Sequence, residues 1–363
     1  MPDRLDDPRF VLRNDPKGMM GLTEGFPEQC REALSLAESA ALPGDCGGRR
    51  SVVVAGMGGS AAGGDFLRAL FEEQASVPCI VCRDYVLPKF VSEDSLLFAC
   101  SYSGNTEETL AATEEALSRG CAVIAITSGG RLAELAEANG FPAVHIPGGQ
   151  PPRTALGYLF IPLVYAARTL GYLPEQPFAD AFSLLEKCCA DWAVSAELKH
   201  NPTKALASRL FGRVPVLYGL GPWQALVATR WKGQLNENAK VMAFANAFPE
   251  LNHNEILGWT FSDRQNAHNW ATVILEGGLE SAKMQTRVAV TTDLIRDKSE
   301  VYRASARGER LLEQILTLTY FGDFVSLYLA ALYGVDPENI DAINTLKRAL
   351  SEAVTPPIRG TPR

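Results

Sequence analysis

Apolar and polar residues follow each other along the chain in blocks that predict strands alternating with helices. The run SVVVAG at 51–56 is short, β-branched and closed by a glycine, which is typical of a buried parallel strand that turns into a helix. Stretches such as FLRALFEEQ and TEETLAATEEALSRG predict the helices between it and later apolar runs. Those runs lie at 78–81, 95–100, 122–127 and 143–146. This alternation predicts a doubly wound, mainly parallel sheet flanked by helices, with right-handed crossovers.

The same order of elements begins again in the second half of the chain. The segment PGGQPPR at 147–153 is rich in proline and glycine and marks a boundary, and a long helical stretch follows it at 154–210. From residue 214, VPVLYGLGPWQALVATRWKGQLNENAK again predicts a strand, a glycine turn and a helix. We predict further strands at ATVILEG and VAVTTDL, and a strongly apolar helix at LLEQILTLTYFGDFVSLYLAALYG. These are two copies of one architecture without a clear sequence repeat.

The length of 363 residues suits two domains better than one core. The predicted organisation is a helical N-terminal segment (1–50), a first α/β domain (51–153), a helical connection (154–210), a second α/β domain with C-terminal helices (211–352) and a tail (353–363). The tail, with the sequence TPPIRGTPR at its end, is expected to be disordered.

Composition excludes several classes of partner. The net charge is −8 and no basic run is present, whereas a nucleic-acid or anionic-membrane surface needs a positive footprint. The polar N-terminus MPDRLDDPRF does not resemble a signal peptide, and we identify no stretch of about 20 apolar residues that would span a bilayer. Eight cysteines scattered through apolar segments indicate buried thiols in a reducing compartment, so we expect a cytoplasmic protein.

Neither a redox pair nor a metal site is predicted. Cys79 and Cys82 form a CxxC, but they fall inside a predicted strand and not at a helix start, where such a pair would be activated. No histidine lies at i, i+4 to another or beside a cysteine pair, as a zinc site would require. The four histidines are His145, His200, His253 and His268.

A glycine-rich turn, GMGGSAAGGD at 56–65, follows the first strand. Its glycines let the backbone approach a ligand, and the next helix offers free N–H groups to an anion. Gly56, Gly58 and Ala61 also satisfy a loose dinucleotide fingerprint, but Asp84 comes late for the acidic residue that a nicotinamide site needs. No Lys-Ser/Thr pair follows, which excludes a Walker loop. A tight structural turn without a ligand is the remaining alternative.

A second cluster, SYSGNTEETL at 101–110, opens the helix after the strand at 95–100. Ser101, Ser103 and Thr106 bring three hydroxyls to a strand-to-helix turn, where the helix dipole already favours an anion. Such a set can hold a phosphate monoester without lysine or arginine. A helix cap at Asn105 or Thr106 would explain one or two of these residues but not the whole run.

Together these two motifs resemble the phosphate-binding signature of sugar-isomerase (SIS) domains, and more specifically that of the bifunctional phosphoglucose/phosphomannose isomerases of archaea and bacteria. Three further stretches resemble that family: LDDPRF…DPKGM…EGFPEQ, PPRTALGY and NENAK…PELNHNEILGW. The similarity runs from near the N-terminus to Lys347. It implies two SIS-type doubly wound domains and an aldose–ketose isomerase for glucose-6-phosphate and fructose-6-phosphate, with mannose-6-phosphate as a further substrate.

The resemblance also implies a role for each matching residue. The phosphate-binding set is Gly58, Gly59, Ser60, Ser101, Ser103 and Thr106. Glu237 would move a proton between C1 and C2 through a cis-enediol, and Arg153 would stand over the reacting carbons. His253 would act in ring opening, with help from Lys347. No metal or other cofactor is implied, and the active site would be shared across a homodimer, with the histidine donated by the neighbouring subunit.

The residue types fit this chemistry, and each has a plainer interpretation. One carboxylate suits a proton shuttle, yet Glu237 alone would more often be a solvent-facing residue. Arg153 offers a permanent charge to an enediolate, or is simply an arginine after a Pro-Pro loop. His253 can exchange a proton near neutral pH, whereas a lone histidine is more often structural. Lys347 lies in an amphipathic C-terminal helix, where a lysine is usually solvated.

Three other functions stay open. A different SIS enzyme, such as an amino-sugar phosphate isomerase, is the nearest alternative. A non-catalytic sugar-phosphate sensor would carry one SIS unit beside a DNA-binding segment, and we identify no such segment. A nicotinamide-dependent oxidoreductase rests on the loose glycine fingerprint alone.

Overall fold

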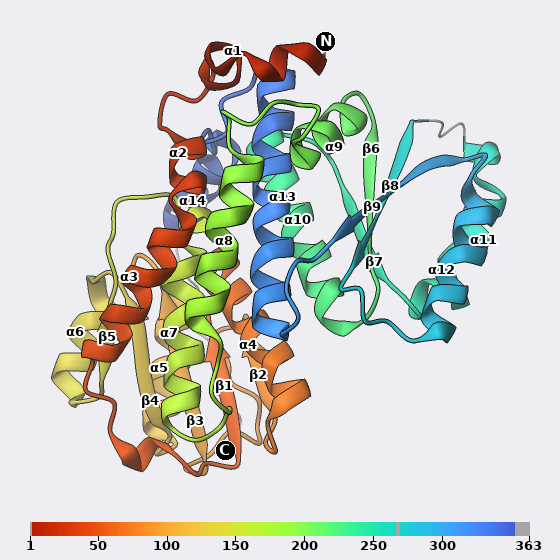
Figure 1. Ribbon diagram of the computed structural model, residues 1–363. Coiled ribbons are helices and arrows are strands. Elements are labelled where there is room, and N and C mark those ends of the chain that lie inside the picture. The colour runs from red at the N-terminus through yellow and green to blue at the C-terminus, as the bar shows by residue number, and fades with distance from the viewer. Residues whose placement is uncertain (1, 266–268, 353–363) are drawn as a thin grey trace.

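The computed structural model, which describes residues 2–265 and 269–352, contains two separate parallel sheets, each lying between helices (Figure 1). The first sheet has five strands in the order β2-β1-β3-β4-β5. The elements up to its last strand are η1 (Pro2–Asp6), α1 (Pro8–Leu12), α2 (Met19–Glu24), α3 (Phe26–Ser39), η2 (Gly44–Cys46), β1 (Ser51–Ala55), α4 (Gly58–Gln74), β2 (Cys79–Cys82), β3 (Ser95–Ser101), α5 (Glu107–Ser118), β4 (Ala122–Thr127), α6 (Gly130–Asn139) and β5 (Ala143–His145). All strand pairs are parallel, as predicted.

The second sheet has four parallel strands in the order β7-β6-β8-β9. The remaining elements are η3 (Pro152–Thr154), α7 (Leu156–Thr169), α8 (Phe178–Trp192), α9 (Pro202–Leu210), β6 (Val214–Gly219), α10 (Pro222–Ala239), β7 (Phe244–Ala247), η4 (Glu250–His253), α11 (Glu255–Thr260), η5 (Ser262–Gln265), β8 (Trp270–Glu276), α12 (Ala282–Ile295), β9 (Ser299–Ser305), α13 (Leu311–Tyr333) and α14 (Asp341–Glu352). The α/β class with two doubly wound sheets is therefore confirmed. The domain boundaries stay a prediction, and the tail at 353–363 lies outside the described residues.

Strand β1 shows why the first sheet is covered on both faces. All five of its residues are buried, and successive side chains point to opposite faces. Val52 and Val54 belong to the core that includes α4 and α7, whereas Val53 and Ala55 belong to a second core with α5. The sheet thus has helices on both sides, and its strand order reverses between β1 and β3. In open α/β sheets, ligands bind at the carboxyl ends of the strands at such a reversal.

The prediction of a strand at VAVTTDL (288–294) is wrong, because these residues belong to helix α12. β-Branched residues gave the segment a strand-like composition, but Val288, Thr291 and Ile295 are buried at helical spacing. The Ser281 side chain caps the helix by accepting from Met284 N at 3.3 Å. The sheet is completed instead by β7 and β9, two strands that sequence analysis did not predict.

Helix α13 runs through the middle of the molecule, beside α8 and α10 (Figure 1). By length and composition it could cross a membrane, so the expectation that the chain holds no such stretch is wrong. However, 94% of its most apolar window is buried inside the protein, as in the core helix of a soluble domain. Close packing with α10 depends on Gly322, where a Cβ would lie 2.2 Å from Trp231 Nε1. That indole N–H donates to Leu318 O at 2.8 Å.

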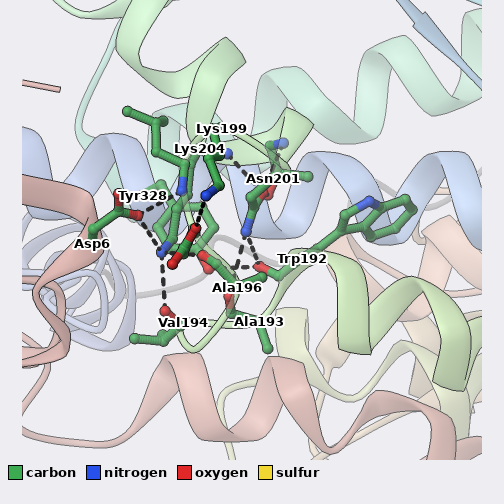
Figure 2. Close-up of polar contacts among 12 residues, drawn as sticks. Asp6, Trp192, Ala193, Val194, Ala196, Lys199, Asn201, Lys204 and Tyr328 are labelled. Atoms are coloured by element: carbon green, nitrogen blue, oxygen red, sulfur yellow. Dashed lines mark hydrogen bonds and ion pairs between the residues drawn. The ribbon is translucent and has the colours of Figure 1, made fainter. Parts of the chain in front are cut away.

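A buried lysine holds the N-terminal segment against the second half of the chain (Figure 2). Lys204 is fully buried on α9, and its Nζ donates to Val194 O at 2.9 Å and Ala196 O at 2.6 Å. The same Nζ pairs with Asp6 Oδ1 of η1 at 3.4 Å and lies 5.6 Å from the ring centroid of Tyr328. Burial lowers the pKa of Lys204, and the Asp6 carboxylate opposes that shift.

Candidate active site

A cavity of ≈ 210 Å³ lies between α4 of the first sheet region and α10 of the second. Gly58 and Gly59 of its lining closely follow β1, and Arg83 follows β2. Its lining residues are Gly58, Gly59, Ala62, Asp65, Phe66, Arg83, Arg153, Leu226, Thr229, Arg230, Gly233, Gln234 and Glu237. Four of the residues singled out in the sequence therefore line one cavity: Gly58, Gly59, Arg153 and Glu237.

The glycine-rich turn brings the start of α4 against the segment that carries Arg153. A Cβ at Gly59 would lie 2.8 Å from Pro152 O, so only glycine permits this approach. Ser60 follows in the first turn of α4 and is buried, and its Oγ accepts from Tyr102 N at 3.3 Å. The turn after β1 is thus hydrogen-bonded to the turn after β3, as two halves of one anion site would be.

Hydroxyls gather at the turn between β3 and α5. Ser101 Oγ and Thr106 Oγ1 lie 2.9 Å apart, and Ser101 is fully buried. Thr106 is the N-cap of α5 by position, but its side chain makes no capping hydrogen bond. The helix-cap interpretation therefore does not account for this hydroxyl, which stays available to an anion beside the helix N-terminus. Ser103 is exposed, and its Oγ accepts from Asn105 N at 3.3 Å.

Arg153 and Glu237 form an ion pair at the cavity wall. Arg153 Nη1 lies 3.4 Å from Glu237 Oε2, with the arginine side chain 6% exposed and the glutamate side chain 39% exposed. Burial lowers the pKa of Arg153, while the charge of Glu237 opposes the shift. A buried cation therefore stands beside a carboxylate that solvent or a ligand can reach. This is an arrangement that can move a proton and stabilise a developing negative charge.

His253 and Lys347 are not brought to this cavity within one chain. His253 ends η4, beyond β7, and Lys347 lies on α14; both side chains are exposed. Neither lines the cavity formed by residues 58–237 of the described chain. Their roles stay a prediction that one chain alone does not fulfil. Of the four histidines considered for a metal site, His268 lies outside the described residues.

Sequence analysis missed the polar groups that surround Arg153. Arg153 Nε donates to Asn238 Oδ1 at 2.8 Å and Arg153 Nη2 donates to Pro337 O at 2.7 Å. Arg230 Nη2 donates to Arg153 O at 2.8 Å. A signal was present, because Arg230, Gln234 and Asn238 are spaced by four residues and share one helix face. Asp65 and Arg83 also line the cavity and form an ion pair.

The cysteines have the surroundings of structural thiols. None of the eight, all within the described residues, is in a disulfide, seven are buried, and Cys79 and Cys82 lie in β2 as predicted. Burial raises the pKa of both thiols, which makes them poor nucleophiles. Among residues 2–265 and 269–352, no group of three or more His, Cys, Asp or Glu side chains has an arrangement that could hold a metal ion.

Two family models match this chain, one over the region of each sheet. Residues 48–140 match the SIS domain, and residues 199–350 match the bacterial phospho-glucose isomerase C-terminal SIS domain. The chain is 39% identical over 332 residues to a bifunctional phosphoglucose/phosphomannose isomerase of Caldicellulosiruptor bescii, covering 90% of this chain and 97% of that protein. The protein of the same description from Thermoplasma acidophilum is 38% identical over 301 residues, covering 83% and 90%. Among solved structures, a hypothetical protein from Thermus thermophilus superposes with a TM-score of 0.73 at 17% identity, covering 97% and 95%.

Proposed function

We propose that this chain, which belongs to the bifunctional phosphoglucose/phosphomannose isomerases, works without a metal ion and through a cis-enediol. It interconverts glucose-6-phosphate or mannose-6-phosphate with fructose-6-phosphate. The observation that carries this mechanism is the Arg153–Glu237 pair, a buried cation beside an accessible carboxylate at one cavity. We further propose that the enzyme is cytoplasmic and serves glycolysis and gluconeogenesis.

The substrate phosphate is held at the two turns of the first sheet. Ser60, Ser101, Ser103 and Thr106 offer hydroxyls, and the N-termini of α4 and α5 offer N–H groups. Gly58 and Gly59 let the phosphate approach the backbone. The proposal is supported by the Ser101–Thr106 contact, which places two hydroxyls 2.9 Å apart at one turn. This part of the site fixes the sugar and does not take part in bond changes.

Glu237 and Arg153 carry the isomerisation. The Glu237 carboxylate takes the proton from C2 of the open-chain aldose, which gives the enediol, and returns it to C1, while a second proton moves from O2 to O1. The Arg153 guanidinium stabilises the negative charge on the enediolate oxygens. No electron acceptor is needed, because C1 is reduced by the same step that oxidises C2.

Ring opening is assigned to His253, with Lys347 assisting. These two exposed residues lie outside the cavity of their own chain, so the proposal assigns them to a neighbouring subunit, with a homodimer as the active unit and a shared site. Mixing Glu237→Gln with His253→Ala protein should then restore activity through subunit exchange. One of the two sites of each hybrid dimer would carry both wild-type groups. Activity of an isolated monomer would contradict the shared site.

The experiment that tests the function is a coupled assay of the purified protein with fructose-6-phosphate, glucose-6-phosphate and mannose-6-phosphate, before and after exhaustive chelation. We expect turnover of all three, unchanged by EDTA. Activity lost under chelation and restored by zinc would overturn the metal-free mechanism. Turnover of an amino-sugar phosphate alone would identify the other SIS enzyme, and binding without turnover would identify a sensor.

A further inference from the structure

The interface between α10 and α13 contains a chain of polar side chains where apolar ones would be expected. Asp323 and Ser326 lie on a helix that is buried along 311–331, where the one other charged residue is Glu313. Asp323 faces Arg230 and Gln234 on α10. Its carboxylate lies 3.3 Å from Arg230 Nη2 and accepts from Gln234 Nε2 at 2.7 Å. Burial raises the pKa of Asp323, and the charge of Arg230 opposes that shift.

This chain of contacts ends at Arg153. Ser326 Oγ accepts from Asn238 Nδ2 at 2.9 Å and donates to Asp323 O at 2.7 Å. Asn238, only 1% exposed, turns its Oδ1 to Arg153 Nε. Arg230 joins the same residue at its backbone, by donating to Arg153 O. Both the side chain and the main chain of Arg153 are therefore held by residues that α13 orients.

Two fixed contacts define the direction of a planar guanidinium. Asn238 Oδ1 holds the Nε edge at 2.8 Å and Pro337 O holds Nη2 at 2.7 Å. The remaining nitrogen, Nη1, is the one that lies beside Glu237 at the cavity. Rotation of the side chain would break both contacts inside the protein, where water does not replace them. Arg153 thus presents one nitrogen to the cavity in one orientation.

Stability does not require this arrangement. A buried ion pair can be replaced by well-packed apolar residues at little cost or with a gain in stability. Apolar packing of that kind is present in the same α10–α13 interface, where Trp231 stacks on Phe321 with ring centroids 5.6 Å apart. The polar chain is confined to the end of the interface near Arg153. The position of these polar contacts therefore indicates a role at the candidate site and not in packing the core.

We propose that Asn238 and Arg230, supported by Asp323 and Ser326 of α13, are positioning residues for the isomerisation: they fix the Arg153 guanidinium over the reacting carbons. The proposal deepens the proposed function and rests on the role of Arg153 given there. Asn238 does not touch the substrate and acts through Arg153. A displacement of about 1 Å at a reacting centre costs up to about 10²-fold in rate, so loss of this support should appear in kcat.

The test compares two variants of equal shape, Asn238→Leu and Asn238→Asp. Leucine removes the acceptor for Arg153 Nε, and aspartate keeps it. We expect Asn238→Leu to lower kcat about 30-fold or more with KM changed less than about threefold, because the phosphate contacts are intact. Asn238→Asp should retain kcat within about tenfold of the wild type. A role in folding alone would instead lower kcat of both variants only in proportion to the folded fraction.

A matched control is Asn201→Leu, because Asn201 is also 1% exposed but caps α9 away from the cavity. It should lose stability and keep the kcat of its folded fraction. The double variant Arg230→Met/Asp323→Leu removes a charge pair together, so the fold should survive while kcat falls at least about tenfold.

The outcomes separate this inference from the proposed function. Wild-type kcat in folded Asn238→Leu protein, with Glu237→Gln inactive, would overturn the positioning role and leave the mechanism intact. Full activity of Glu237→Gln would overturn the mechanism itself, whatever the Asn238 variants do.

Discussion

Arg153 and Lys204 are both buried cations, but Arg153 lines the candidate cavity and Lys204 does not. Lys204 Nζ has three N–H donors and three oxygen partners, on Val194, Ala196 and Asp6, and the group is fully enclosed (Figure 2). Arg153 has five N–H donors but three described partners, one for each nitrogen. The nitrogen paired with Glu237 lies at the cavity. A cation with donors to spare at an open cavity can receive new negative charge.

The difference also shows in what each group holds. Lys204 joins η1, near the N-terminus, to the loop before α9, so it fastens one segment to another. Arg153 joins the end of the first sheet region to α10 and to the segment after α13, so it lies where both halves of the chain meet. Burial lowers the pKa of both groups, so the direction of a pKa shift alone does not distinguish a candidate site residue from an architectural one.

The sharpest contrast should come from Arg153→Met. Methionine keeps much of the volume but removes the cation from the cavity, so the enediolate loses its electrostatic partner. We expect kcat to fall about 10²- to 10³-fold, the scale for loss of one such stabilising group. Steady-state kinetics with fructose-6-phosphate measure this. Arg153→Met protein that is folded and retains wild-type kcat would make Arg153 an architectural residue like Lys204.

The partner of Arg153 should give the next largest effect. Glu237→Gln keeps the shape of the side chain and removes the base, so kcat should fall about 10²-fold or more with little change in KM. Exchange of the C2 hydrogen with deuterated solvent, followed by NMR, should stop as well. If the glutamine variant exchanges that hydrogen at a near wild-type rate, the base lies elsewhere.

The phosphate turn should affect binding and not chemistry. Ser101→Ala together with Thr106→Ala removes two hydroxyls 2.9 Å apart, so KM should rise about tenfold or more with a smaller change in kcat. Inhibition by sugar-phosphate analogues should weaken in parallel. Equal turnover of glucose and its phosphate by the unaltered enzyme would show that the turn does not hold the substrate.

Lys204→Met should show the opposite behaviour to Arg153→Met. The buried carbonyls of Val194 and Ala196 lose their donor, so the unfolding free energy should fall by about 2 kcal/mol, while the folded protein keeps its kcat. Urea unfolding and the coupled assay measure the two quantities. Lys199→Met is the control, because that lysine pairs with Glu197 at the exposed surface and its loss should change stability little. A large loss of kcat in folded Lys204→Met protein would contradict a purely architectural role for Lys204.

The smallest effect concerns alkaline pH. Burial sets the folded-state pKa of Lys204 below the ordinary lysine value of about 10.4, so the unfolded chain binds more protons between the two pKa values. Stability of the wild type relative to Lys204→Met should therefore rise with pH in that window, by at most about 1.4 kcal/mol per pH unit. Urea unfolding of both proteins from pH 8 to about pH 10.5 tests the sign. A difference that falls as pH rises would contradict the lowered pKa.

Local signals in the sequence were sufficient for the first sheet. Strands β1 and β3 are buried on both faces and so form continuous apolar runs, and the glycine and serine turns follow them directly in the chain. The second sheet was harder to predict. The burial of β9 is irregular, and α12 carries β-branched residues, so composition favoured the wrong one of the two as a strand.

The sequence by itself determined the candidate residues for the proposed chemistry and the turns that present them, because a strand, a glycine turn and a helix start are local features of the chain. Only the tertiary structure decided which residues meet. Arg153 and Asn238 are 85 positions apart, and Arg153 and Pro337 are 184 apart, so no spacing in the sequence indicates these hydrogen bonds. Such contacts depend on the packing of α10 against α13, where shape and hydrogen-bond satisfaction act over the whole core.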